Sequence, residues 1–323
     1  MHGNLEPKLG VNAAEEELLD WLTDVADDPY RFVMEAFPWG EEGTTLEKDL
    51  GPEPWQRDIL AAVKAGLPLD RAIQLATASG HGIGKSACVS WLILWAVSTF
   101  PDTRGVITAN TETQLKTKTW AELGKWFHLF IAKHLFKLTA TALFQPDRER
   151  TWRIDMIPWS ERNTEAFAGL HNKGKRILIL FDEASAIPDI IWETAEGALS
   201  DKDTQIIFAV FGNPTRNTGR FRECFAGGQF HRFWNCRQVD SREVSFTNKA
   251  DIARKIEAYG EDSDYVRIRI LGVFPRRGEM EFFNAEDIDA AMLRDVSTSP
   301  FDPLALGVDV ARYGGNASVI FPR

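Results

Sequence analysis

The sequence predicts an α/β fold in which helices cover both faces of a mostly parallel sheet. Strand-like apolar runs alternate with helical patterns between residues 72 and 211, which is the pattern of a parallel sheet with crossover helices. A second observation is the run 176–181, which is apolar after its first residue and is followed by two acids. Such a run is typical of a strand buried on both faces.

The predicted elements follow in a regular order. Two amphipathic helices, 14–25 and 28–37, precede a polar loop at 40–51, and a third helix, 55–63, starts after Pro54, a residue favoured at helix starts. The main block then contains strands at 72–77, 106–108, 152–157, 176–181 and 206–211, and helices at 87–97, 113–135, 190–199, 249–259 and 264–270.

A glycine-rich turn lies between the strand 72–77 and the helix 87–97 and ends in Lys-Ser. In such a turn, backbone N–H groups and a helix N-terminus face an anion, so we expect it to bind the phosphates of a nucleotide. Lys85 can reach the β- and γ-phosphates, and the Ser86 hydroxyl suits a Mg²⁺ ligand. The residues of this loop are Ser79, Gly80, His81, Gly82, Ile83, Gly84, Lys85 and Ser86.

The match to the common phosphate-loop pattern is imperfect, because Ser79 stands where that pattern has its first glycine. Taken alone, the loop could be a glycine-rich hairpin with a chance Lys-Ser pair. The two acids after the strand 176–181 argue against that alternative, because they supply the matching half of a nucleotide site.

Asp182 and Glu183 follow the apolar strand directly. The carboxyl end of such a strand lies in the crevice where α/β sheets bind ligands. We expect Asp182 to hold Mg²⁺ through water and Glu183 to act as the general base that polarises the attacking water. The alternative is that both acids only cap the helix near Pro188.

A third position at the same predicted sheet edge is the turn 212–215, Gly-Asn-Pro-Thr, after the strand 206–211. Asn213 or Thr215 could sense whether a γ-phosphate is present. The alternative is an ordinary Asn-Pro turn.

Composition bounds the class of protein. The chain has 323 residues, 44% hydrophobic and 26% charged, as in a soluble globular protein. Its apolar runs are too short to span a membrane, its first residues lack the pattern of a signal peptide, and its three cysteines have no metal-ligand spacing. These features favour a reducing cytoplasm.

The net charge of −10 argues against a general affinity for nucleic acid but leaves room for a local basic path. Two clusters could form such a path or could be solvated faces. They are Lys116, Lys118, Lys125, Lys133 and Lys137, and Arg216, Arg220, Arg222, Arg232 and Arg237.

The last residues have a different organisation. Residues 275–302 have the composition of a linker around one short helix, 285–293, and acid-bearing strand patterns follow at 304–311 and 318–321. We therefore divide the chain into an N-terminal helical segment, a main domain, a linker and the opening of a second domain, at 1–50, 51–274, 275–302 and 303–323.

With these motifs, the chain resembles the large terminase subunit of tailed bacteriophages, the motor that packages DNA into procapsids. The resemblance implies a P-loop NTPase domain of the ASCE/RecA-like class followed by the start of an RNase H-like nuclease domain. It is carried, in order, by residues 55–56, 79–86, 108–110, 182–183, 212–214, 272–275 and 307–311.

The resemblance also implies residue roles and partners. Gln56 would read the adenine edge, residues 212–214 would couple hydrolysis to movement, and Asp309 would be the first nuclease metal ligand. An arginine finger is expected, with Arg162, Arg176 or Lys173 as candidates. The implied cofactors are ATP and Mg²⁺, and the implied partners are double-stranded DNA, the portal protein, the small terminase subunit and a homo-oligomeric ring on the procapsid, in the cytoplasm of an infected bacterium and without a membrane.

A two-metal nuclease needs several acids around a sheet, and only fourteen residues follow Asp309 (323 − 309 = 14). We therefore expect these 323 residues to lack nuclease activity. Two other functions stay open: a helicase-like ATPase, which would need a second RecA-like domain, and an assembly protein that binds nucleotide with little turnover.

Overall fold

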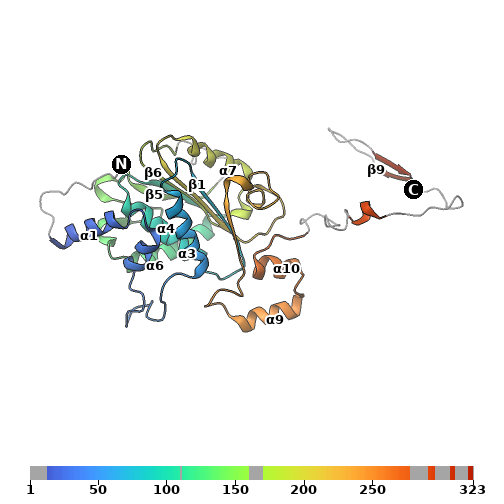
Figure 1. The fold of residues 1–323 in the computed structure, drawn as a ribbon, viewed down its shortest axis with the longest axis horizontal. Coiled ribbons are helices and arrows are strands. Elements are labelled where there is room, and N and C mark those ends of the chain that lie inside the picture. The colour runs from blue at the N-terminus through green and yellow to red at the C-terminus, as the bar shows by residue number, and fades with distance from the viewer. Residues whose placement is uncertain are drawn as a thin grey trace. The chain divides into compact units, whose positions relative to one another are not determined.

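The computed structural model describes residues 13–109, 111–159, 170–276, 290–294, 306–309 and 319–322 (Figure 1). The chain divides into two compact units, Met1–Met280 and Glu281–Arg323. The first unit contains the sheet, the cores and the candidate site, and each unit is described by itself.

The described part of the first unit contains an eight-stranded sheet in the order β3-β4-β5-β2-β6-β7-β1-β8. Strands β5, β2, β6, β7, β1 and β8 are parallel, and β4 and β3 are added antiparallel at one edge. The predicted α/β class with a mostly parallel sheet is confirmed. The strands are β1 (Ile73–Ser79), β2 (Arg104–Thr108), β3 (Lys137–Leu138), β4 (Ala142–Phe144), β5 (Arg153–Met156), β6 (Arg176–Phe181), β7 (Gln205–Gly212) and β8 (Asn235–Val239).

The helices fall close to the predicted ranges, with one exception. The predicted helix 113–135 is wrong as a single element: it is a short α-helical turn, a π-helical segment and a helix that ends before the extended residue Phe130. The helices are α1 (Ala13–Asp24), α2 (Pro29–Ala36), α3 (Pro54–Gly66), α4 (Lys85–Thr99), α5 (Glu112–Gln114), η1 (Leu115–Trp120), α6 (Ala121–Leu129), α7 (Asp189–Glu196), α8 (Arg220–Glu223), α9 (Lys249–Tyr259), α10 (Asp264–Val266) and η8 (Arg267–Leu271).

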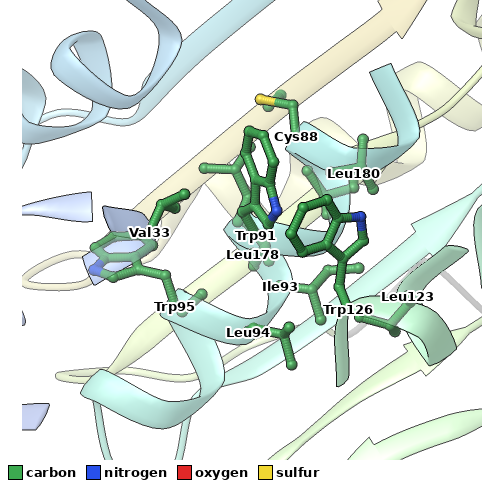
Figure 2. Close-up of a cluster of buried hydrophobic side chains, with 14 of the residues drawn as sticks. Val33, Cys88, Trp91, Ile93, Leu94, Trp95, Leu123, Trp126, Leu178 and Leu180 are labelled. Atoms are coloured by element: carbon green, nitrogen blue, oxygen red, sulfur yellow. The ribbon is translucent and has the colours of Figure 1, made fainter. Parts of the chain in front are cut away.

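The described residues form two hydrophobic cores, one on each face of the sheet. Alternation along β6 separates them: Leu178 and Leu180 lie in one core, and Ile177 and Ile179 lie in the other, because successive side chains of a strand point to opposite faces. Figure 2 shows the first core, in which side chains of α4 and α6 pack against Leu178 and Leu180. The second core is covered mainly by α7 and α8.

The N-terminal helices belong to the first core. Trp39 packs against Trp91 of α4 and Trp126 of α6, with ring centroids 5.7 and 5.5 Å apart, and Phe32 and Val33 of α2 are fully buried. Helix α4 itself is buried along nearly its whole length, so it needs this cover. The described residues of the predicted N-terminal helical segment 1–50 therefore pack as part of the first unit.

In the second unit, β9 (Leu306–Asp309) and β10 (Val319–Pro322) pair antiparallel, with Val319 opposite Asp309. This agrees with the predicted strand pair. Residues 290–293 are helical, within the predicted helix 285–293. The rest of that helix and most of the predicted linker lie outside the described residues.

Candidate nucleotide-binding site

Three sequence motifs meet at one edge of the sheet. Strands β6, β7 and β1 are neighbours and run parallel, so Asp182, Asn213 and Ser79 are placed at the same, carboxyl-terminal edge. Strand β7 lies between the other two, which is why its Asn213 can reach the loop after β1: the Asn213 Nδ2 donates a hydrogen bond of 2.6 Å to the Ser79 carbonyl.

The loop after β1 ends at an uncapped helix N-terminus. Gly84, the residue before α4, has φ +84°, a left-handed conformation, and no side chain caps the helix. The first N–H groups of a helix have no intrahelical partner. At the 15-residue helix α4 they are available to an anion, as the sequence predicts.

Lys85 is held at the base of this loop. Its Nζ donates a hydrogen bond of 3.0 Å to the Ser79 hydroxyl. Burial lowers the pKa of Lys85, and the nearby carboxylates of Glu183 and Asp182 oppose that shift. The ammonium group therefore lies within electrostatic reach of both predicted acids.

A cleft of about 460 Å³ brings the predicted residues together. It contains both halves of the expected site, because Lys85 and Ser86 line it together with Glu183 and Asn213. Its lining residues are His81, Gly82, Ile83, Gly84, Lys85, Ser86, Ala87, Lys118, Glu122, Glu183 and Asn213.

Asp182 lies beside this cleft and is 5% exposed. The Thr119 hydroxyl donates a hydrogen bond of 2.6 Å to its Oδ2, and the Glu183 N–H donates one of 3.0 Å to its Oδ1. These bonds fix the carboxylate and leave further lone pairs on each oxygen. With the Ser86 hydroxyl, Asp182 supplies the oxygen donors that Mg²⁺ prefers.

Glu183 is in a strained backbone conformation, with φ +54°. Left-handed non-glycine residues of this kind cluster at functional sites. Burial, and then repulsion by Asp182, raise the pKa of Glu183, while Lys85, Lys118 and Arg269 act in the opposite direction. A raised pKa makes the carboxylate a better proton acceptor, which suits a general base.

Sequence reasoning missed Lys118 and Thr119 as site residues. Both lie in η1, where the π-helical segment presents Lys118 to the cleft and Thr119 to Asp182. Single-turn π-helical insertions are frequent at functional sites. The sequence carries no clear signal for a π-helical insertion, and it indicates Lys118 only as a member of a basic cluster.

Gln56 does not line the cleft, contrary to the role implied for it. It is 2% exposed, its Oε1 accepts a hydrogen bond from the Glu53 N–H, and its Nε2 donates one of 3.0 Å to the Gly84 carbonyl. The neighbouring Trp55 donates to the Ile83 carbonyl at 3.2 Å. Residues 55–56 therefore support the phosphate loop through its backbone carbonyls, and the adenine-reading role of Gln56 stays a prediction.

The start of the phosphate loop is hydrogen-bonded to the segment 239–272, which lies far along the chain. The Gly80 N–H donates to the Val239 carbonyl, and the His81 N–H donates to the Arg269 carbonyl. A Cβ on Gly80 would lie 2.2 Å from the Ser241 Oγ, so only glycine fits there. Ser79 and Gly80 thus support the loop, whereas residues 81–86 face the cleft.

The His81 side chain contacts Arg269 of the segment 239–272. Its Nε2 lies 2.9 Å from a guanidinium nitrogen of Arg269. Desolvation and then the charge of Arg269 lower the pKa of His81 to about 4, so the imidazole is neutral at pH 7 and accepts this hydrogen bond.

Arg176, one of the predicted candidates for the arginine finger, does not lie at this edge. Arg176 begins β6, six residues before Asp182 and about 20 Å away along the strand. It is fully buried, donates to the Thr99 hydroxyl at 2.8 Å and stacks on Trp95 at 4.1 Å. The structure contradicts Arg176 as a finger for this cleft. Lys173 precedes the same end of β6, and Arg162 lies outside the described residues.

The other predicted residues have a mixed outcome. The Thr215 hydroxyl bonds to the Ser185 hydroxyl at 3.0 Å, on the turn after Glu183. Asp309 ends β9, but its side chain lies outside the described residues. In the described parts of the chain, no group of three or more His, Cys, Asp or Glu residues forms a metal site.

Several members of the predicted basic clusters are neutralised. Lys116 and Lys125 pair with Glu112 and Glu122, and Arg220 and Arg237 pair with Glu196 and Asp58. These pairs reduce the positive potential of either cluster.

No helix among the described residues is long and apolar enough to span a membrane.

Comparisons with known proteins agree with the motifs. No protein-family model matches the sequence. The chain is 28% identical, over 256 residues, to the probable terminase large subunit of Enterobacteria phage P7. The alignment covers 75% of this chain and 51% of the relative, so the chain spans about half the length of that relative. The resemblance to terminase large subunits is confirmed at this level.

Solved structures show the same fold. The large terminase of bacteriophage HK97 aligns with a TM-score of 0.55 at 15% identity, covering 92% of this chain and 67% of that chain. The large terminase of the thermophilic bacteriophage D6E aligns with a TM-score of 0.50 at 12% identity, covering 88% and 61%. Over the aligned residues, this chain therefore shares the fold of these large terminases.

Proposed function

We propose that this chain is the ATP-hydrolysing part of a phage DNA-packaging motor, which translocates double-stranded DNA into a procapsid. The observation that carries the proposal is the shared cleft: Lys85 and Ser86 face the same space as Glu183, with Asp182 beside it. Resemblance to the terminase large subunit of phage P7 supports the assignment of the motor.

The residues divide the work of hydrolysis. Lys85 and the N-terminus of α4 bind the phosphates of ATP. Ser86 and Asp182 would hold Mg²⁺, which would neutralise phosphate charge. Glu183 orients the attacking water and accepts its proton, and Thr119 keeps the Asp182 carboxylate in position. Asn213 links the end of β7 to the phosphate loop and can report the state of the γ-phosphate.

Lys118 supplies a second cation to the cleft. It lowers the pKa of Glu183 and lines the same space as Lys85. A positive charge there stabilises the charge that develops on the transferred phosphoryl group. This assignment replaces Arg176. Arg162 stays a candidate for a finger supplied to a neighbouring subunit.

The wider assignment follows the resemblance. The partners would be double-stranded DNA, the portal protein, the small terminase subunit and further copies of the chain in a ring, in the cytoplasm of an infected bacterium. The acidic net charge of −10 favours docking onto protein partners over free binding to DNA.

The test is ATP hydrolysis with Mg²⁺, measured against protein concentration and with added double-stranded DNA. A motor with a finger in trans gives a specific rate that rises steeply with concentration. A flat, negligible rate favours the nucleotide-binding assembly protein, and unwinding of a forked duplex favours the helicase-like ATPase.

A further inference from the structure

The side chain of Phe246 lies beside the phosphate loop. Its side chain is 57% exposed, although a phenylalanine gains most by burial. The edge of the ring lies over Gly84: a Cβ on that glycine would be 3.1 Å from Phe246 Cζ. An exposed aromatic ring therefore borders the loop that receives the phosphates.

The loop that carries Phe246 is fixed in place. The Lys249 Nζ donates to the carbonyls of Ser241, Arg242 and Val244, and Val244 is 1% exposed in the first core. Three carbonyls around one ammonium group close this loop tightly. Phe246 is thus exposed on a rigid support.

The same loop is hydrogen-bonded both to the start of α3 and to the phosphate loop. The Ser245 N–H and hydroxyl both donate to the Glu53 carboxylate at the start of α3. The Ser241 hydroxyl donates to the His81 carbonyl at 2.8 Å. The ring therefore keeps its position relative to the phosphate loop.

The Gln56 side-chain amide keeps only one N–H and one oxygen lone pair for the edge of a base. Both ends of that amide are engaged, with the Glu53 N–H and the Gly84 carbonyl. An aromatic face binds any base by stacking, because every base has a π-face. Recognition through Phe246 would thus depend on the presence of a base more than on its identity.

We propose that Phe246 is the stacking platform for the base of the nucleotide whose phosphates bind at residues 82–86. The ligand is a nucleoside triphosphate, and the site discriminates weakly between ATP and GTP. This inference rests on the proposed function, since it concerns the same cleft.

The experiment compares two ligands, ATP and inorganic tripolyphosphate, each with Mg²⁺, by calorimetric titration of the full chain. Phe246→Ala should weaken ATP binding about tenfold or more, whereas tripolyphosphate affinity should stay within about twofold because that ligand has no base. Phe246→Trp should keep ATP affinity. GTP should bind the unmodified chain within a few-fold of ATP.

The matched control is Phe233→Ala. Phe233 is similarly exposed, at 53%, but borders the opposite end of β1, near Ile73. This variant should leave both affinities unchanged.

Three results would overturn the inference: equal losses for both ligands, no loss of ATP affinity in Phe246→Ala, or an effect of that variant confined to DNA stimulation or oligomerisation. The last result would make Phe246 a macromolecular contact. If the unmodified chain bound neither ligand, the proposed function itself would fail. Binding of both ligands without any dependence on Phe246 would remove only the stacking platform.

Discussion

The Thr119 hydroxyl donates a hydrogen bond of 2.6 Å to Oδ2 of Asp182, which joins the π-helical segment η1 to the acid at the end of β6. The neighbouring residue, Lys118, faces the cleft. One short segment therefore positions the carboxylate that we assign to Mg²⁺ and also contributes a cation to the cleft. Any movement of η1 would change both at once.

Thr119→Val should weaken Mg²⁺ binding. The variant keeps the shape of the side chain but removes the donor to Asp182. Loss of such a supporting hydrogen bond typically costs about 10–100-fold in metal affinity or activity. We expect the Mg²⁺ concentration for half-maximal ATP hydrolysis to rise by about tenfold, measured by titration at saturating ATP. The control is Thr117→Val, whose exposed hydroxyl donates to the Thr113 carbonyl; equal effects of the two variants would remove the role of Thr119.

The pH dependence of hydrolysis should report Glu183. Its pKa is raised and it acts as a base when ionised, so the rate should be lost as pH falls, at a pH above the range of an ordinary glutamate. Lys118→Ala removes a cation that lowers this pKa, so the acid limb of the rate should move to still higher pH. Lys116→Ala, which removes a lysine paired with Glu112, should leave the limb in place. A limb unchanged in Lys118→Ala would contradict the assignment.

Arg176 should matter for stability and not for chemistry. Arg176→Ala leaves a cavity and unpaired groups in the core, and should lower the free energy of unfolding by about 3–5 kcal/mol. Arg176→Met keeps most of the volume and removes a buried charge, so its loss should be smaller. Denaturant titration measures both. ATP hydrolysis per folded molecule should stay near normal in Arg176→Met, whereas a finger would lose orders of magnitude.

The N-terminal helices should be required for folding. Deletion of residues 1–50 removes Phe32, Val33 and Trp39 from the first core and uncovers α4. We expect loss of the cooperative unfolding transition, measured by circular dichroism. Deletion of residues 281–323, the second unit, should leave that transition in place. A stable, ATP-binding product of the first deletion would show that the first unit folds without residues 1–50.

The positions of the strands could be predicted from the sequence where the strands are buried. The predicted strand 176–181 coincides with β6, because a run buried on both faces has a strong apolar signal. Strand β8 (Asn235–Val239) was missed because it is an edge strand with polar, partly exposed side chains. The antiparallel pair β3 and β4 was missed because two or three residues carry too little pattern.

The site residues could be predicted where they follow a strand in the sequence. They could not be predicted where their position depends on contacts between residues far apart in the sequence. Asp182 and Glu183 directly follow one predicted strand, and Lys85 and Ser86 end the turn after another, so topology brings them together. The position of Lys118 depends on a π-helical segment, and that of Phe246 depends on how residues 239–272 fold back onto the phosphate loop. Neither arrangement leaves a local sequence signal.

The most direct measurement is a pair of substitutions at the two walls of the cleft, read by ATP binding and by single-turnover hydrolysis. Lys85→Ala should weaken ATP binding itself, since it removes the cation of the cleft to which we assign phosphate binding. Glu183→Gln should bind ATP with near-normal affinity while hydrolysis falls by about 10²–10⁴-fold. Normal turnover in Glu183→Gln, or normal ATP affinity in Lys85→Ala, would contradict a single site built from these two residues.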